Sequence, residues 1–329
     1  MRLELRSAAA AVGHIVCHNI ADQRGRKALA KGRILREADL SLLAELGVAE
    51  LRVAILEPDD VHENDAAIRL AAAVAGDGVA ATTAHVGRVN LRATCAGPLE
   101  VNTEALRAIN LIDGLTVATL AAHTLVGEGR NLATIKIIPF AVPASDLVQA
   151  EVVAREAGIV LRVRPLTLRR IGVVLVSSPA AHQRVAHGVY PAIVARVHEL
   201  GGEVIARHDV MPKETEVATA LQRLRDAGAE LVIVAGETSV VDLEDVTPQG
   251  VRLAGGQIAH YGAPVEPGNL LLMAYLHHAS GGRLPVLGAP GCVRSRDVNI
   301  VDLVLPRLMA GEMIGRREIV ELGHGGLLS

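Results

Sequence analysis

The fold is decided by Leu231-Val-Ile-Val-Ala-Gly-Glu-Thr-Ser-Val-Val-Asp242, an apolar run that stops in a loop of small and polar residues. Two further segments also combine apolar residues with a loop that contains Gly and Pro: Pro264-Val-Glu-Pro-Gly-Asn269 and Val286-Leu-Gly-Ala-Pro-Gly-Cys-Val-Arg-Ser295. In an open α/β sheet, ligands bind at the carboxyl ends of the strands. We therefore expect the three loops to form one binding crevice. Their exposed backbone N–H groups suit an anionic ligand such as a phosphate.

The second half of the chain alternates strands and helices regularly. We predict strands at 171–176, 203–207, 231–235, 269–275 and 284–288 and helices at 182–200, 215–227, 247–253 and 296–309. Such alternation produces a mostly parallel sheet with helices on both faces, which is the doubly wound α/β fold.

The first half shows no such regularity. We predict strands at 13–20, 51–56, 88–95, 116–120, 132–138 and 159–163 and helices at 40–46, 63–75, 103–111 and 145–157. This pattern indicates a mixed α+β region of one or two lobes. Pro165 disfavours helix at the residue before it and marks the boundary. The expected domains are an N-terminal region at 1–165, an α/β domain at 166–317 and a tail at 318–329.

The composition excludes several function classes. A chain of 329 residues is long enough for two or three domains of roughly 100–200 residues each. A net charge of −3, with three Tyr, one Phe and no Trp, argues against nucleic-acid binding. The N-terminus lacks a signal-peptide core, and no apolar run reaches a membrane span of roughly 18 residues. These features predict a cytoplasmic protein without membrane association.

Cysteine and histidine do not form a recognisable metal motif. Cys17, Cys95 and Cys292 are far apart and include no CxxC pair, so neither a zinc site nor a disulfide framework is predicted. His277 and His278 are adjacent, but neighbours on a strand point to opposite faces of the sheet. We therefore expect no histidine metal site.

Four motifs stand in a fixed order in the second half. They are Gly236-Glu-Thr-Ser-Val-Val-Asp-Leu-Glu-Asp245, Val265-Glu-Pro-Gly-Asn269, Leu287-Gly-Ala-Pro-Gly-Cys292 and Leu303-Val-Leu-Pro-Arg-Leu-Met-Ala-Gly311. Together they resemble the molybdopterin-binding domain of molybdenum cofactor biosynthesis proteins, such as molybdopterin molybdotransferases. Upstream, residues 133–142 and the final 323–328 resemble a branch that often precedes a molybdopterin nucleotidyltransferase domain.

The resemblance implies a pterin phosphate as ligand, with Mg²⁺ or molybdate as a further component and metal insertion as the reaction. It implies Asp242 as the catalytic acid, and a nucleotidyltransferase or a second copy of the chain as partner. The implied binding residues are Ser177, Gly236, Glu237, Thr238, Ser239, Asp242, Asp245, Pro267, Gly268, Asn269, Pro290, Gly291, Arg294 and Ser295.

The sequence departs from the family pattern at three places. Glu237 replaces the second signature glycine, Cys292 replaces the Asn after Pro-Gly, and Ser177-Ser-Pro-Ala180 replaces a Ser-Thr-Gly-Asp-like loop. We expect these changes to affect catalysis more than binding, because backbone donors survive side-chain substitution.

Some residues and the function itself have alternative interpretations. The acids at 242–245 could cap the helix at 247–253, and Ser295 could be the N-cap of the helix predicted at 296–309. The chain could be a non-catalytic carrier or partner of a nucleotidyltransferase. It could also be a nucleotide-processing enzyme, because competence-damage-like proteins carry the same type of domain.

Overall fold

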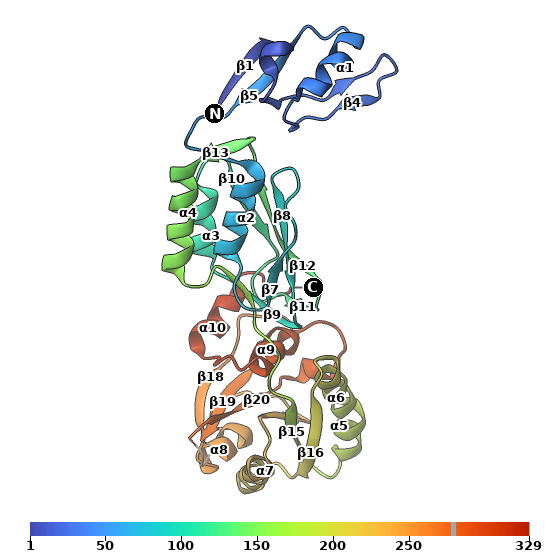
Figure 1. Ribbon diagram of the computed structural model, residues 1–329. Helices are drawn as coiled ribbons and strands as arrows, with labels where there is room; N and C mark the ends of the chain where they lie inside the picture. The colour runs from blue at the N-terminus through green and yellow to red at the C-terminus, as the bar shows by residue number, and fades with distance from the viewer. Residues whose placement is uncertain (278–280, 329) are drawn as a thin grey trace. The chain divides into compact units, whose positions relative to one another are not determined.

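The structure is a computed structural model that describes residues 1–277 and 281–328 (Figure 1). The chain divides into two compact units, Met1–Arg164 and Pro165–Ser329. His278, half of the adjacent histidine pair, lies outside the described residues. Among the residues described, no helix combines the length and the apolar composition that crossing a membrane requires.

The second unit is built on one six-stranded sheet. Its order is β16 (Glu203–Val210), β15 (Arg170–Val176), β17 (Leu231–Gly236), β20 (Arg283–Gly288), β19 (Leu272–His277) and β18 (Gln257–Tyr261). The first four strands are mutually parallel, and β19 is antiparallel to both β20 and β18. The predicted mostly parallel α/β sheet is therefore confirmed, with β18 as an additional edge strand that the sequence did not reveal.

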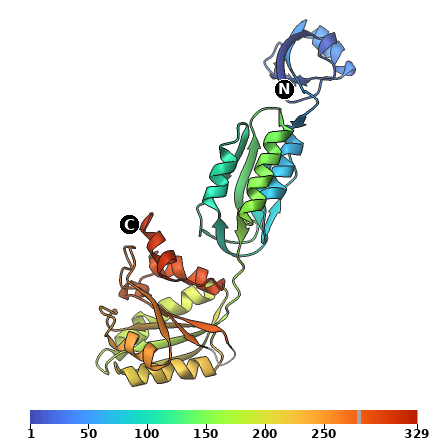
Figure 2. The ribbon, with the colours of Figure 1, turned by 90° about the vertical axis from the view of Figure 1, so that its left-hand side faces the viewer.

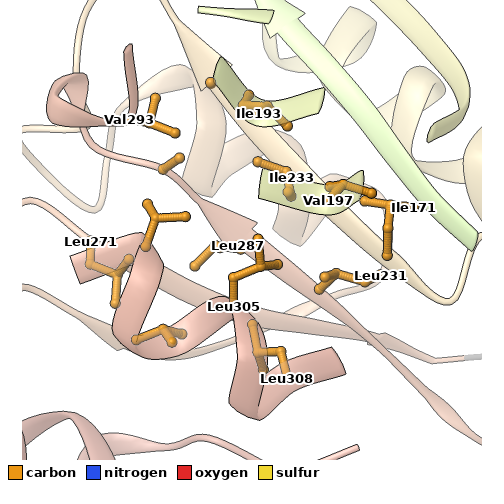
Figure 3. Packing of buried hydrophobic residues seen from close by; sticks show 14 of the residues in the cluster. Ile171, Ile193, Val197, Leu231, Ile233, Leu271, Leu287, Val293, Leu305 and Leu308 are labelled. Carbon is orange, nitrogen blue, oxygen red and sulfur yellow. The ribbon is translucent and has the colours of Figure 1, made fainter. Parts of the chain in front are cut away.

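Helices cover both faces of this sheet. Alternate residues of each strand point to opposite sides, so an apolar strand presents side chains to the helices on both faces. On one face, Ile171, Val173 and Leu175 of β15 share a core with α5 (His182–Gly188), α6 (Tyr190–Glu199) and α9 (Ile300–Met309). Figure 3 shows Ile171, Ile193 and Leu305 in this core. On the other face, Val174 packs with α7 (Glu214–Asp226) and α8 (Val246–Leu253), the yellow and orange helices of Figure 2.

Two predicted helices differ from those observed. The helix predicted at 182–200 is split into α5 and α6 at Val189, because Pro191 has no N–H to donate and its ring clashes with the preceding turn. The helix predicted at 296–309 begins only at Ile300. Its N-cap is Asn299, whose side chain accepts the Val301 N–H at 3.0 Å. The interpretation of Ser295 as N-cap is therefore wrong.

The first unit contains the predicted mixture of helices and short strands, with two main hydrophobic cores and a small cluster of Ile15, Cys17 and Ala54. The smaller core lies under the sheet β1 (Arg2–Ser7), β5 (Glu50–Ile55) and β2 (Ile15–Val16), together with α1 (Leu40–Glu45). The strand predicted at 13–20 is wrong beyond Val16. The chain turns there into the hairpin of β3 (Ile20–Ala21) and β4 (Lys27–Leu29), and the Asn19 side chain accepts the Lys31 N–H at 2.9 Å.

The larger core lies between a sheet and three helices. The sheet has the order β10 (Leu115–Thr119), β12 (Asn131–Ile137), β8 (Arg88–Ala93) and β7 (Val79–Ala81), and the helices are α2 (Glu63–Val74), α3 (Thr103–Asn110) and α4 (Ala144–Ala157). Smaller sheets join β11 (Leu125–Val126), β9 (Gly97–Val101) and β14 (Leu161–Val163), and pair β13 (Ala141–Pro143) with β6 (Asp60–His62). Glu100 on β9 accepts hydrogen bonds from Arg162 at 2.5 Å and Arg164 at 2.7 Å.

Candidate functional site

The predicted binding loops leave the sheet of the second unit at one edge. Val176 at the end of β15 pairs with Gly236 at the end of β17, and Val234 pairs with Gly288 at the end of β20. Gly288 in turn faces Leu272, the first residue of β19, which faces Tyr261 at the end of β18. Because β19 is antiparallel, the loop 262–271 returns to the edge that carries the other loops.

A cavity of about 310 Å³ opens at this edge. It is lined by Val176, Pro212, Val234, Ala235, Gly236, Glu237, Thr238, Ser239, Val240, Val241, Asp245, Val246, Thr247 and Ala289. Five of the residues proposed from the sequence are among them: Gly236, Glu237, Thr238, Ser239 and Asp245. The other proposed residues lie outside this lining: Ser177, Asp242, Pro267, Gly268, Asn269, Pro290, Gly291, Arg294 and Ser295.

Glu237 follows β17, and its carboxylate contacts the loop that follows β15. Its two oxygens accept the Ser178 N–H at 3.2 Å and the Ser178 hydroxyl at 2.8 Å. The neighbouring Ser177 is buried, and its N–H donates to Val210 O at 3.0 Å. Among the described residues that line the cavity, Glu237 and Asp245 are acidic and none is Lys, Arg or His. The cavity therefore favours a ligand group that donates hydrogen bonds over a bare phosphate.

The acidic residues after β17 brace their own loop. Asp242 Oδ1 accepts the Glu244 N–H at 2.8 Å, and Asp245 Oδ2 accepts the N–H groups of Val241 at 2.7 Å and Asp242 at 3.1 Å. Asp245 occupies the N-cap position of α8, but its side chain accepts no bond from the helix. Asp245 therefore does not cap the helix through a side-chain hydrogen bond, whereas Glu244 accepts hydrogen bonds from the Gln249 and Arg252 side chains of α8.

Tyr261 at the end of β18 closes this acidic turn. Its hydroxyl donates to Val240 O at 3.0 Å. Burial, and then the negative charges of Asp245 and Asp242, raise the pKa of Tyr261. The hydroxyl therefore keeps its proton as a hydrogen-bond donor at neutral pH.

The carboxylates do not form a ready metal site. Within residues 1–277 and 281–328, no group of three or more His, Cys, Asp and Glu side chains is placed to hold a metal ion. The Asp242 and Asp245 carboxylates already accept N–H groups of their own loop. These bonds use Oδ1 of Asp242 and Oδ2 of Asp245, so one oxygen of each carboxylate is committed to the loop.

Arg196 of α6 holds the loop after β20, a role that was not predicted from the sequence. Its side chain is only 2% exposed and pairs with Asp302 at 2.8 Å. It also donates to the carbonyl oxygens of Val293 at 3.0 Å, Ser295 at 2.7 Å and Asp297 at 3.3 Å. The available signal was a lone arginine among apolar residues on the buried face of a predicted helix.

The loop after β20 is tied to the loop after β17. The Gly291 N–H donates to Ser239 Oγ at 2.9 Å, although the two residues are 52 positions apart in the sequence. Cys292 follows in this loop, and burial raises the pKa of its thiol. The thiol is therefore not activated as a thiolate at neutral pH.

Arg294 is the cation nearest to these loops in the sequence. It is exposed and has no hydrogen-bond or ion-pair partner among the residues that the structure describes. Ser295 donates its hydroxyl to Asp297 at 2.7 Å. Arg294 ends the short 3-10 helix η3 (Gly291–Arg294) and Ser295 is its C-cap, so neither residue lies at the N-terminus of α9.

The loop 262–271 is packed against the start of α9. The Ile300 N–H donates to Pro267 O at 3.2 Å, and Asn269 Nδ2 donates to Glu266 at 2.8 Å. Gly268 adopts φ +139°, and a Cβ there would lie 2.2 Å from the Ile300 side chain. Residues 326–328 complete the loop, since the Glu266 N–H donates to Gly326 O at 3.0 Å.

Comparisons with known proteins bear on both units. Residues 172–310 match the family described as "Probable molybdopterin binding domain", and residues 7–55 match a "Domain of unknown function (DUF8806)". The comparison with curated proteins found no match.

Several solved structures are similar to parts of the chain. The tungsten cofactor synthesizing protein MoaB from Pyrococcus furiosus is 18% identical, covers 44% of this chain over 92% of its own, and has a TM-score of 0.32. MogA is also 18% identical, with 43% and 93% covered and a TM-score of 0.28.

A molybdenum cofactor biosynthesis protein from Pyrococcus furiosus is 12% identical and aligns with 97% of this chain, with a TM-score of 0.26. The present chain spans 65% of the length of that protein. The family match coincides with the six-stranded sheet and the loops at its edge. Residues 172–310 therefore form a domain of the molybdopterin-binding family.

Proposed function

We propose that this chain binds molybdopterin, or its nucleotide or metal-loaded form, during molybdenum cofactor biosynthesis. The match of residues 172–310 to the molybdopterin-binding family carries the proposal. The loops gathered at the carboxyl edge of the sheet support it, because that edge is where open α/β sheets bind their ligands.

The charges around the edge suggest how the ligand lies. A pterin ring presents amino and ring N–H groups, and a carboxylate accepts such donors. Glu237 lines the cavity with that chemistry, whereas Arg294 is an exposed cation without a partner among the described residues. The proposed arrangement therefore places the ring towards Glu237 and the phosphate towards Arg294, with the remaining residues proposed from the sequence between or beside them.

Binding is a better-supported role than metal insertion. Asp242 is the proposed catalytic acid, but its Oδ1 accepts the Glu244 N–H and it does not line the cavity. Together with the changes at Glu237 and Cys292, this favours a second candidate: a carrier or partner domain that serves a nucleotidyltransferase.

Mass spectrometry of the ligand released from the purified full chain tests the proposal. A pterin phosphate supports it, whereas a pyridine dinucleotide would favour the nucleotide-processing alternative and contradict it. Conversion of a bound pterin in the presence of molybdate would distinguish metal insertion from simple carriage.

The phosphate position is tested separately with two arginine variants. Arg294→Ala should weaken pterin phosphate binding roughly 10–100-fold, because it removes a charge-assisted contact. Arg296→Ala is the matched control, since Arg296 is paired with Glu199 at 2.5 Å and is not among the proposed binding residues. Equal affinities of the two variants in calorimetry would rule out Arg294 as the phosphate ligand.

A further inference from the structure

Strand β1 is an open edge of the N-terminal sheet. It pairs with β5 along all six of its residues, and no other strand among the described residues pairs with its outer side. Natural edge strands are normally kept short, bulged, interrupted by Pro or charged, because an open edge recruits further strands. β1 has no bulge and no Pro.

One face of β1 is apolar and exposed. Leu3 and Leu5 are 54% and 62% exposed. They face Ala54 and Arg52 of β5, so they lie on the side of the sheet opposite to the core residue Val53. Two large leucines side by side on an open edge favour a partner strand that adds apolar side chains to the same face.

The other face of β1 carries charges in an alternating order. Glu4 lies between Arg2 at 3.2 Å and Arg6 at 3.0 Å, so the order along the strand is positive, negative, positive. All three side chains are at least about one third exposed, so these ion pairs can exchange partners at little cost in free energy.

This charge order is complementary to itself. When two copies of one edge pair antiparallel, residues whose backbone groups point outward must face each other. The Ala8 N–H donates to Ala49 O at 3.0 Å in the same register, so the backbone groups of Glu4 and Arg6 point at β5 and those of Leu5 point outward. The alignment in which Leu5 faces Leu5 of the second copy places Glu4 opposite Arg6 and Arg6 opposite Glu4. The next allowed alignment, shifted by two residues in the pairing, places Glu4 opposite Glu4 and is disfavoured because like charges repel.

We propose that β1 is a homodimer interface, in which two copies pair antiparallel about Leu5 and join their sheets into one. In this arrangement the two Leu5 side chains are directly opposite, and each Leu3 is diagonal to Leu5 of the second copy. The four leucines then form one apolar cluster, and two crossed ion pairs lie on the opposite face. The interface is independent of any ligand of the second unit.

Charge reversal tests the pairing by sedimentation velocity on the full chain over a range of concentrations. Wild-type chain should self-associate to a dimer. Glu4→Arg or Arg6→Glu alone should raise the dimer Kd at least about tenfold, because each variant opposes like charges at two places. The double variant restores opposite charges and should return Kd to within about threefold of wild type. Glu45→Arg, an exposed acid on α1, is the control and should leave Kd unchanged.

Cross-linking tests the register. Under oxidising conditions Leu5→Cys should form a covalent dimer, whereas Leu111→Cys, at a residue that is 73% exposed elsewhere in the same unit, should not. A wild-type chain that stays monomeric overturns the proposal. A double charge variant that associates no better than the single variants overturns it as well, even if both single variants are folded.

Discussion

Replacing Arg196 by Met removes the buried guanidinium that holds the loop after β20 while keeping most of the side-chain volume. In the wild type the guanidinium satisfies Asp302 and the carbonyl oxygens of Val293, Ser295 and Asp297. Removing one partner of a buried ion pair typically costs about 3–5 kcal/mol, because the remaining charge stays buried and unpaired. Asp302 is 29% exposed, so part of its charge can be solvated, and we expect a loss near the lower end of that range.

The assay is urea denaturation of the full chain, in which the unfolding transition of the second unit is monitored. Arg196→Met should lower the free energy of unfolding by about 3 kcal/mol. Hydrogen exchange should accelerate at the amides of 291–299, whose loop the arginine braces. Arg296→Met is the matched control at the same loop and should leave the midpoint near that of the wild type, because Arg296 is exposed. A loss below about 1 kcal/mol for Arg196→Met, the size of one ordinary hydrogen bond, would refute the reasoning.

Three further predictions concern single residues. Gly268→Ala should destabilise the second unit by at least about 1–3 kcal/mol in thermal unfolding, because its Cβ would overlap the Ile300 side chain; an unchanged Tm would contradict the packing. Glu237→Gly should tighten the binding of inorganic pyrophosphate at least about tenfold in calorimetry, because it removes a charge of the same sign as the ligand. Equal affinity would show that the Glu237 carboxylate does not repel anions from the loop. Although burial opposes ionisation, the two arginines beside Glu100 lower its pKa, so its stabilisation is present above the unfolded pKa of about 4.3 and is lost as the pH falls through the folded value. Glu100→Gln should therefore flatten the acid limb of the stability profile, and an unchanged limb would contradict this assignment.

The central strands of the second unit could be predicted because they are buried on both faces. β15, β17 and β20 are nearly continuous apolar runs that end in Gly or small polar residues, as parallel central strands do. β18 could not be predicted in the same way. Its five residues are mostly half-buried at the edge of the sheet, and the sequence Gln-Ile-Ala-His-Tyr has neither a strong apolar run nor clear alternation.

The candidate site was predictable in its location but not in its internal contacts. Strand ends identify the loops, because parallel strands bring their carboxyl ends to one edge. The pairing of Glu237 with Ser178 joins residues 59 positions apart and leaves no local pattern. The start of α9 was placed too early because Ser295 and Asp297 resemble a capped helix start, whereas Asn299 and Asp302 form the actual capping box.

The hydrogen bond from the Gly291 N–H to Ser239 Oγ makes the two loops thermodynamically dependent on each other. A ligand that displaces the Ser239 hydroxyl oxygen from the Gly291 N–H leaves that N–H without its acceptor and therefore more available to an anion. An anion that captures the Gly291 N–H likewise frees the Ser239 hydroxyl. The free-energy change is the same in either order of binding, so occupancy of one loop must alter the affinity of the other by the same factor in both directions.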